Sequence, residues 1–303
     1  MQYPKEIENV IAQIKSSLHE YVSSKKLEGP TAISPDTASL LVRAMSVCQG
    51  DITLLTKARQ KLTEWQLPDG RVALSPEMPH IHWYTAYAIF AWTKAPGFEK
   101  NAQRAISFLL RTNGIHCAES VKSTVSHDTT LQGWPWISDT HSWVEPTAMA
   151  LIALKANGFE KHERANNAAL MLIDRQLPDG GWNYGNTFVY GTELKPIPEY
   201  TAIALSALHG YITHEKVKKS LVYLERELET IRTPLTLSRG ICALGKWPQR
   251  PENSDKIIIE STMCQRRYGP YSLTLLAEIL IAFLTSDGFT IRSYQGWRNG
   301  IWE

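Results

Sequence analysis

The chain has 303 residues, which is enough to bury a large hydrophobic core. Its formal net charge of +2 comes from lysines and arginines spread along the whole sequence, so composition gives no case for nucleic-acid binding. The four cysteines are widely spaced and form no Cys-x-x-Cys pair, which argues against a disulfide framework and against a structural zinc site.

The first residues, Met-Gln-Tyr-Pro-Lys-Glu, are charged and lack the apolar core of a signal peptide. No stretch approaches the roughly 18 apolar residues of a membrane-spanning helix. We therefore expect a soluble cytoplasmic protein. Peripheral contact with a membrane remains an alternative, because a hydrophobic substrate would need a source.

Taken in chain order, the first predicted element is an amphipathic helix, in which Ile7, Val10, Ile14 and Leu18 recur at helical spacing. Four apolar runs follow, and each opens on a Thr-Ala pair. The threonines of these pairs are Thr37, Thr85, Thr147 and Thr201. The runs are apolar almost all round, as in 148–154, and such a helix is buried on every side.

A second helix with a visible polar face follows each of the later runs, at 100–111, 163–176 and 216–227. Two more buried helices are predicted near 235–244 and 271–284. The repeating unit is therefore a hairpin of one buried and one half-exposed helix. Strand signals are scarce.

A turn motif recurs with this period. Residues 176–182 read Gln-Leu-Pro-Asp-Gly-Gly-Trp, and a weaker copy, Gln-Leu-Pro-Asp-Gly, stands at 66–70. Pro ends the helix, Asp favours the turn, and Gly takes a positive φ without steric cost. The repeat predicts an all-α, single-domain protein over 1–303, in which about six hairpins close into an α/α toroid.

The Gln-x-x-Asp-Gly-Gly-Trp turn and the Thr-Ala helix starts resemble the terpenoid cyclase and protein prenyltransferase superfamily, in particular the squalene–hopene cyclase repeat. The stretches 133–148 and 179–186 are similar to small single-domain bacterial proteins named as prenyltransferase or squalene-cyclase repeat proteins. The resemblance implies an α/α toroid with an apolar central cavity that holds an isoprenoid substrate.

The family's catalytic motifs are present only in part. Cyclases that start by protonation carry Asp-x-Asp-Asp-Thr-Ala, whereas residues 33–38 here read Ile-Ser-Pro-Asp-Thr-Ala. The position of the family's acid is therefore Pro35, and Asp36 matches the last Asp of the motif. The Asp-x-Cys pair of the zinc-binding prenyltransferases and the Asp-Asp-x-x-Asp motif of ionising terpene synthases are absent. We expect no metal and no cofactor.

Four carboxyls near the starts of the buried helices are the candidates for the acid: Glu145, Glu199, Asp139 and Asp36. A carboxyl kept protonated in a dry, apolar cavity can protonate an alkene or epoxide. The alternative role is structural, because carboxylates also bind the free N–H groups at helix N-termini. His82, His127, Asp128 and His141 match no metal-ligand spacing, and His141 could instead orient a nearby carboxyl.

Aromatic residues gather near the same helix starts. Aromatic faces stabilise cations by roughly 0.5–2 kcal/mol each, which suits carbocation intermediates, although ordinary packing explains aromatics equally well. The predicted substrate-binding residues are Trp83, Tyr84, Trp134, Trp136, Trp143, Tyr184, Tyr200, Tyr271 and His141. The long segment 113–141 lacks periodicity and is interpreted as a lid over the cavity.

The sequence therefore predicts a metal-independent, acid-initiated cyclisation or isomerisation of an isoprenoid substrate, terpene or meroterpenoid. Two alternatives stay open. One is a non-catalytic toroid that binds a hydrophobic ligand or partner, which the missing acid at Pro35 favours. The other is a glycan-active α/α toroid with paired carboxylates and tryptophan platforms. Substrate length, head group and oligomeric state are not determined by the sequence.

Overall fold

The computed structural model describes residues 3–24, 33–118, 126–189 and 191–292. These residues are mostly helical, as the periodicity predicts. The strands among them form one antiparallel pair, β1 (Phe188–Val189) with β2 (Thr192–Glu193). No helix in the described part of the chain combines the length and the hydropathy that crossing a bilayer requires.

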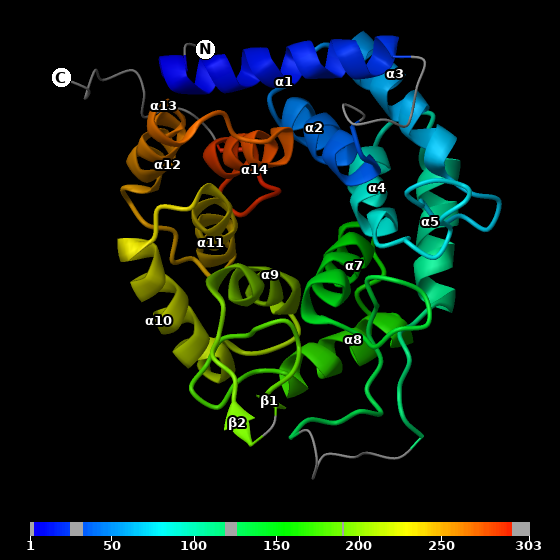
Figure 1. Cartoon of the computed structure of the whole chain (residues 1–303), viewed down its shortest axis with the longest axis vertical. Coiled ribbons are helices and arrows are strands. Elements are labelled where there is room, and N and C mark those ends of the chain that lie inside the picture. The colour runs from blue at the N-terminus through cyan, green and yellow to red at the C-terminus, as the bar shows by residue number, and fades with distance from the viewer. Residues whose placement is uncertain (1–2, 25–32, 119–125, 190, 293–303) are drawn as a thin grey trace.

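Six helices form an inner layer around the centre of the molecule (Figure 1). They are α2 (Pro35–Val47), α4 (Tyr84–Trp92), α7 (Val144–Ala156), α9 (Pro198–Leu208), α11 (Pro234–Lys246) and α14 (Leu273–Leu284). Each inner helix contacts the next one in this order, and α14 contacts α2. The chain thus brings its last inner helix against its first.

A second set of helices lies outside the first and packs against it (Figure 1). It consists of α1 (Lys5–Ser23), α3 (Ile52–Leu62), α5 (Glu99–Arg111), α8 (Glu163–Asp174), α10 (His214–Thr230) and α12 (Ser254–Met263). The short helices η1 (Thr63–Trp65) and α13 (Gln265–Tyr268) extend α3 and α12. Inner and outer helices alternate along the chain, as the predicted hairpin requires.

Burial explains the two layers. Every residue of α4 is buried, and so are Val144 and residues 146–154 of α7. An outer helix buries one stripe only: in α10 the buried positions are Val217, Ser220, Leu221, Leu224 and Leu228. An all-apolar helix must be covered on all sides, whereas an amphipathic helix needs one neighbouring layer. The prediction of a buried and a half-exposed helix in each hairpin is confirmed for these elements.

The threonine of the Thr-Ala pair fastens each of three inner helices to the turn that precedes it. Its buried hydroxyl accepts a hydrogen bond from a backbone N–H of the turn at 2.9–3.0 Å. It also lies 3.2–3.3 Å from the carbonyl oxygen of the same residue. The pairs are Thr85 with Val72, Thr147 with Trp134, and Thr201 with Trp182. The threonine therefore satisfies two buried backbone groups at once.

The turn motifs at 66–70 and 176–182 adopt the same conformation. Gly70 and Gly180 have φ of +100° and +93°, and each donates its N–H at 2.9 Å to the carbonyl oxygen three residues earlier. The expected positive-φ role of these glycines is confirmed, because this backbone region is costly for residues with a Cβ. The indole Nε1 of Trp182 donates to the carbonyl oxygen of Leu172 at 2.7 Å and closes the end of α8.

Trp134 is anchored like Trp182, although its turn has a different backbone, because Gly181 before Trp182 has a φ of +81° whereas Gly133 has no positive φ. Its Nε1 donates to the carbonyl oxygen of Leu109 at 3.1 Å, near the end of α5, as Trp182 does at the end of α8. Gly133 precedes it, and a Cβ there would lie 2.2 Å from the hydroxyl of Thr147. The segment lacks the Pro-Asp pair, and only Gly-Trp is shared with the motif at 176–182.

Candidate functional site

Three of the four predicted acids lie in the first turns of inner helices. Asp36, Glu145 and Glu199 are the second residues of α2, α7 and α9, and all three are half-buried. Asp139 is exposed, in a turn where its own φ is +59°. The structure therefore brings Asp36, Glu145 and Glu199 to the same end of the inner helices and leaves Asp139 on the surface.

Glu145 is held in a buried cluster of three charges. Its Oε1 accepts a hydrogen bond from Nη1 of Arg239 in α11 at 2.8 Å. Arg239 also contacts Glu278 of α14, with Nε 3.4 Å from Oε1. The three side chains are only 13–15% exposed. One guanidinium thus joins two carboxyl groups, and the cluster connects three inner helices.

The cluster affects the ionisable groups around it. Burial lowers the pKa of Arg239, but Glu145, Tyr87 and Glu278 outweigh that effect, so the pKa of this guanidinium lies above its ordinary value. Burial, with Glu145 as the next cause, raises the pKa of the Tyr200 hydroxyl to about 12. The same two causes raise the pKa of Tyr87. Arg239 therefore stays charged and both tyrosines stay neutral at physiological pH.

Glu199 is placed differently, although its position before Thr-Ala is the same. Its Oε1 accepts a hydrogen bond from the hydroxyl of Thr236, which also lies 2.6 Å from the hydroxyl of Thr233. Both threonines are at the start of α11. Glu199 therefore connects two neighbouring inner helices, a structural role that the sequence had left open.

The predicted aromatic residues form two groups at these helix starts. The ring of Trp83 lies 4.2 Å from Tyr84 and packs edge-to-face against Trp136 at 5.1 Å. Tyr184 packs edge-to-face against Tyr200 at 4.9 Å. These residues come from segments far apart in sequence, so the structure does bring five of the nine predicted binding residues into aromatic clusters.

The other four serve packing or lie at the surface. Trp134 is buried in its turn, and the guanidinium of Arg164 stacks over its ring at 4.4 Å. Trp143 precedes α7, and its backbone carbonyl accepts the N–H of Thr147. Tyr271 donates its hydroxyl to the carbonyl oxygen of Ser261 at 2.8 Å. His141 is exposed.

The described part of the segment 113–141 is held by backbone hydrogen bonds. Ile115 donates to Thr140 and Cys117 to Thr129, both at 2.9 Å. Ser138 donates at 2.9 Å to His80, which lies before α4. Residues 119–125 of the predicted lid lie outside the described residues. The segment crosses from the end of α5 to the start of α7, and its role as a lid stays a prediction.

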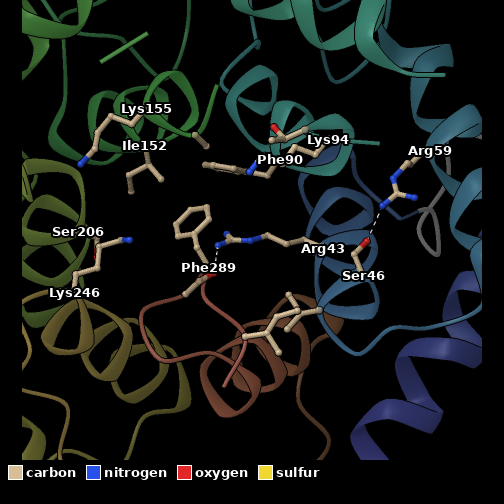
Figure 2. A pocket seen from close by; sticks show the side chains of 15 residues that line it. Arg43, Ser46, Arg59, Phe90, Lys94, Ile152, Lys155, Ser206, Lys246 and Phe289 are labelled. Atoms are coloured by element: carbon tan, nitrogen blue, oxygen red, sulfur yellow. Dashed lines mark hydrogen bonds between the residues drawn. The ribbon is translucent and has the colours of Figure 1, made fainter. Parts of the chain in front are cut away.

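The larger of two adjoining cavities lies at the opposite end of the inner helices (Figure 2). Its volume is about 640 Å³, and its walls combine apolar residues, among them Phe90, Ile152 and Phe289, with basic ones. A smaller cavity of about 60 Å³ shares Arg43, Phe90, Ile152 and Phe289 with it and reaches Arg239 and Glu278. The two together run from the carboxyl ends of the inner helices to the buried charge cluster.

None of the predicted acids or aromatic residues lines either of these two cavities. The residues that do line them were missed, and three share one signal. Arg43, Arg239 and Glu278 are each a single charge within an otherwise apolar run of an inner helix. Charged residues are rarely buried without a partner or a ligand. A lone charge in such a run therefore indicates a partner or a ligand in the interior, between the inner helices.

Among the described residues no group of three or more His, Cys, Asp and Glu side chains is arranged to hold a metal ion. The candidate site thus consists of a cavity with mixed apolar and basic walls and a buried Glu145–Arg239–Glu278 cluster at its inner end. A comparison of the chain with protein-family models finds no match, and a search of curated proteins finds none either.

Proposed function

We propose that this chain is an α/α toroid of the terpenoid-cyclase type. The support is the order of helix contacts: α2, α4, α7, α9, α11 and α14 each contact the next, and α14 contacts α2. The alternation of buried inner and amphipathic outer helices adds to it, as do the three Thr-to-turn connections at matching places. A toroid of this kind encloses its cavity between the inner helices.

The ligand that we propose is an isoprenoid-type chain, bound in the central cavity. One observation carries this: a cavity of about 640 Å³ opens among Val47, Phe90, Ile152, Phe289 and Ile291. Burying each CH₂ group of such a chain is worth about 0.8 kcal/mol, so the apolar part of the wall favours a hydrocarbon chain there.

The reaction that we propose is an acid-initiated cyclisation or isomerisation that needs no metal. Two carboxyls, Glu278 and Asp287, line the inner part of the cavity. Burial raises the pKa of Asp287, but the N–H of Thr290 and the ammonium of Lys246 hold it at about 2, so Asp287 stays ionised. Glu278 remains as the acid, and it contacts Arg239 at a longer distance than Glu145 does.

In this mechanism Glu278 donates its proton to an alkene carbon of the chain, and its carboxylate is then stabilised by the guanidinium of Arg239. The resulting carbocation adds to a further double bond in a cyclisation or keeps its skeleton in an isomerisation, and the final cation returns a proton to the carboxylate of Glu278. Glu145 acts as a positioning residue, because it holds Arg239 in place at 2.8 Å.

The test is incubation of the wild-type protein with farnesyl, geranylgeranyl and squalene-type substrates, followed by mass spectrometry of the products. Glu278→Gln should lower turnover by about 10²–10⁴-fold, since an amide has no acidic proton to give. Glu145→Gln should leave a larger residual rate. If Glu145→Gln abolishes turnover while Glu278→Gln retains it, the acid is Glu145. Unchanged far-UV circular dichroism of both variants controls for folding.

Ligand binding without turnover is the second candidate. It is favoured by the same cluster, because a carboxylate bonded to a guanidinium is an anion rather than a proton donor, and both Glu145 and Glu278 contact Arg239. This candidate predicts a stoichiometric ligand in native mass spectrometry and no product from any substrate. Detection of a cyclised or isomerised product would exclude it.

A further inference from the structure

The segment that follows α14, residues 285–291, turns back toward the centre of the molecule (Figure 1). Figure 2 shows the ring of Phe289 projecting into the larger cavity between Ile152 and Arg43. Gly288 and Phe289 line the smaller cavity as well as the larger one, so this turn lies where the two cavities meet. We call residues 285–291 the plug.

The plug leaves little room in the interior. The smaller cavity, which reaches Arg239 and Glu278, has a volume of only about 60 Å³. An engineered cavity of roughly 150 Å³ binds a single benzene ring, so the smaller cavity has room for water but not for a hydrocarbon chain. The space of about 640 Å³ lies at the carboxyl ends of the inner helices. In this conformation the buried charge cluster is therefore closed to a ligand.

The plug is a self-contained turn. The carboxylate of Asp287 accepts hydrogen bonds from the backbone N–H groups of Phe289 and Thr290, at 2.9 and 2.7 Å. The hydroxyl of Thr285 accepts the backbone N–H of Gly288 at 2.9 Å. Both ends of each of these bonds belong to the plug, so the turn can move as a unit without losing them.

The ends of the plug are anchored away from the cavities. Arg250 donates a hydrogen bond to the carbonyl oxygen of Thr285 at 3.0 Å. Arg292, directly after the plug, forms an ion pair with Asp255 of α12, with Nη2 3.0 Å from Oδ2. Neither arginine lines either of the two cavities. Because Thr285 and Ile291 pair with each other, the two ends lie side by side and can act as one hinge.

One ion pair fastens the tip of the plug to α11. The carboxylate of Asp287 lies 2.9 Å from Nζ of Lys246, and both side chains are less than 20% exposed. The guanidinium of Arg43 adds a hydrogen bond to the carbonyl oxygen of Gly288. Since Asp287 stays ionised, this ion pair persists at neutral pH, and the closed conformation is the resting one.

Closing the plug also costs free energy. The ring of Phe289 covers the guanidinium of Arg43 at 4.2 Å, and burial lowers the pKa of Arg43 below its ordinary value. Burying a cation opposes the conformation that buries it. Apolar surface also remains uncovered, because Phe289 is 36% and Ile291 51% exposed. The closed conformation therefore depends on the ion pair at the tip.

We propose that the plug is an autoinhibitory gate. Closed, as in this structure, it separates the buried charge cluster from the larger cavity, and it opens by swinging about residues 285 and 291 when the Asp287–Lys246 ion pair breaks. Gly288 and Phe289 then leave the interior, and the two cavities join. The gate requires no turnover, whereas its use, admission of a hydrocarbon chain to Glu278, rests on the proposed function.

A thiol behind the plug reports whether it opens. Cys242 of α11 lines the smaller cavity, and a Cβ on Gly288 would lie 3.7 Å from its Sγ. The experiment follows the alkylation of Cys242 by N-ethylmaleimide in the full-length protein by mass spectrometry. Burial raises the pKa of Cys242 to about 11, so rates are compared between variants at one pH. Cys48, which is half-buried and lines neither cavity, reports general unfolding in the same samples.

Two variants break the ion pair with opposite changes of charge. Asp287→Asn keeps an Oδ1 that can accept the N–H groups of the turn, and Lys246→Gln removes the cation instead. A direct electrostatic effect on the Cys242 thiol would therefore differ in sign between them. The matched control is Asp69→Asn, because Asp69 also accepts a backbone N–H within a turn and pairs with an arginine, Arg71, but lines neither cavity.

Both ion-pair variants should accelerate the alkylation of Cys242 by about tenfold or more, because the closed conformation loses a charge-assisted hydrogen bond. The rate at Cys48 should stay unchanged, and Asp69→Asn should behave as the wild type does. The gate is overturned if either ion-pair variant leaves the Cys242 rate at the wild-type value, or if Cys48 accelerates as much as Cys242.

A disulfide tests whether the gate must open for function. Gly288→Cys places a Cβ 3.6 Å from that of Cys242, within the usual range for disulfides of about 3.5–4.5 Å. Gly288→Ala is the control, since it carries the same strain at a φ of +86° without a thiol. If the wild type converts an isoprenoid substrate, the oxidised Gly288→Cys protein should lose turnover and regain it on reduction.

The two proposals fail separately. Turnover that persists at the wild-type rate in the oxidised Gly288→Cys protein overturns the gate and leaves the proposed function intact. Accelerated alkylation of Cys242 in both ion-pair variants, with no substrate bound or converted by any form of the protein, supports the gate and overturns the proposed function.

Discussion

Replacing Arg239 by Met tests the buried charge cluster directly. Arg239 is the cation between Glu145 and Glu278, at 2.8 and 3.4 Å, and all three side chains are at most 15% exposed. Met keeps much of the length of the side chain and removes the charge. The two carboxylates would then face each other across a largely dry interior without a counter-charge, and the folded state should lose stability.

The size of the effect follows from the geometry. Two unit charges about 3 Å apart attract by roughly 5–6 kcal/mol at an effective dielectric constant of about 20, and desolvation offsets much of that in the intact cluster. Removing one partner leaves the desolvation uncompensated, which typically costs about 3–5 kcal/mol. For a chain of 303 residues this corresponds to a decrease in Tm of about 5–8 °C.

Urea denaturation followed by far-UV circular dichroism measures the change in the free energy of unfolding. The control is the triple variant Arg239→Met, Glu145→Gln, Glu278→Gln, which removes all three charges. It should recover much of the lost stability, because no isolated charge remains in the interior. A loss below about 1 kcal/mol for Arg239→Met, or no recovery in the triple variant, would refute the reasoning.

Two further predictions concern stability. Burial and, next, Arg71 lower the pKa of His82 to about 4, so folding favours the neutral ring. Stability should therefore fall as the pH drops from about 6.5 to 4, by up to about 3 kcal/mol, and His82→Phe should remove this part of the pH dependence in urea titrations. Thr201→Val should cost about 1–3 kcal/mol by unfolding measurements, because the buried N–H of Trp182 loses its acceptor. The matched change at the exposed Thr56 should cost less than about 0.5 kcal/mol, and equal losses at both positions would contradict the proposed connection.

The sequence alone determined the helices and their order. Periodicity is a local property. A helix that is apolar on all sides, such as 148–154, must be buried, whereas the single apolar stripe of α10 needs one neighbouring layer to cover it. The Thr-Ala helix starts and the Pro-Asp-Gly turns could also be predicted from the sequence, because the positive φ at Gly70 and Gly180 is a conformation that glycine itself adopts readily. Gly133-Trp134 shares the tryptophan anchor of 176–182 but neither its Pro-Asp pair nor the positive φ of the preceding glycine, and the motif did not predict it.

The composition of the candidate site was decided by the tertiary structure. The sequence placed Glu145 at the start of a buried helix, but not opposite Arg239, which follows 94 positions later in the chain. Likewise, nothing local predicts that Phe289 and Asp287, after the last inner helix, pack beside Arg43 and Lys246.

Such pairings depend on which helices become neighbours when α14 meets α2, and that is set by the packing of all the inner helices together. A lone charge in an apolar run can be recognised from the sequence as a residue whose burial costs free energy. Its partner, its neighbouring cations and the cavity that it faces are fixed only when the helices are in contact, because Coulomb and packing energies depend on distances through space rather than along the chain.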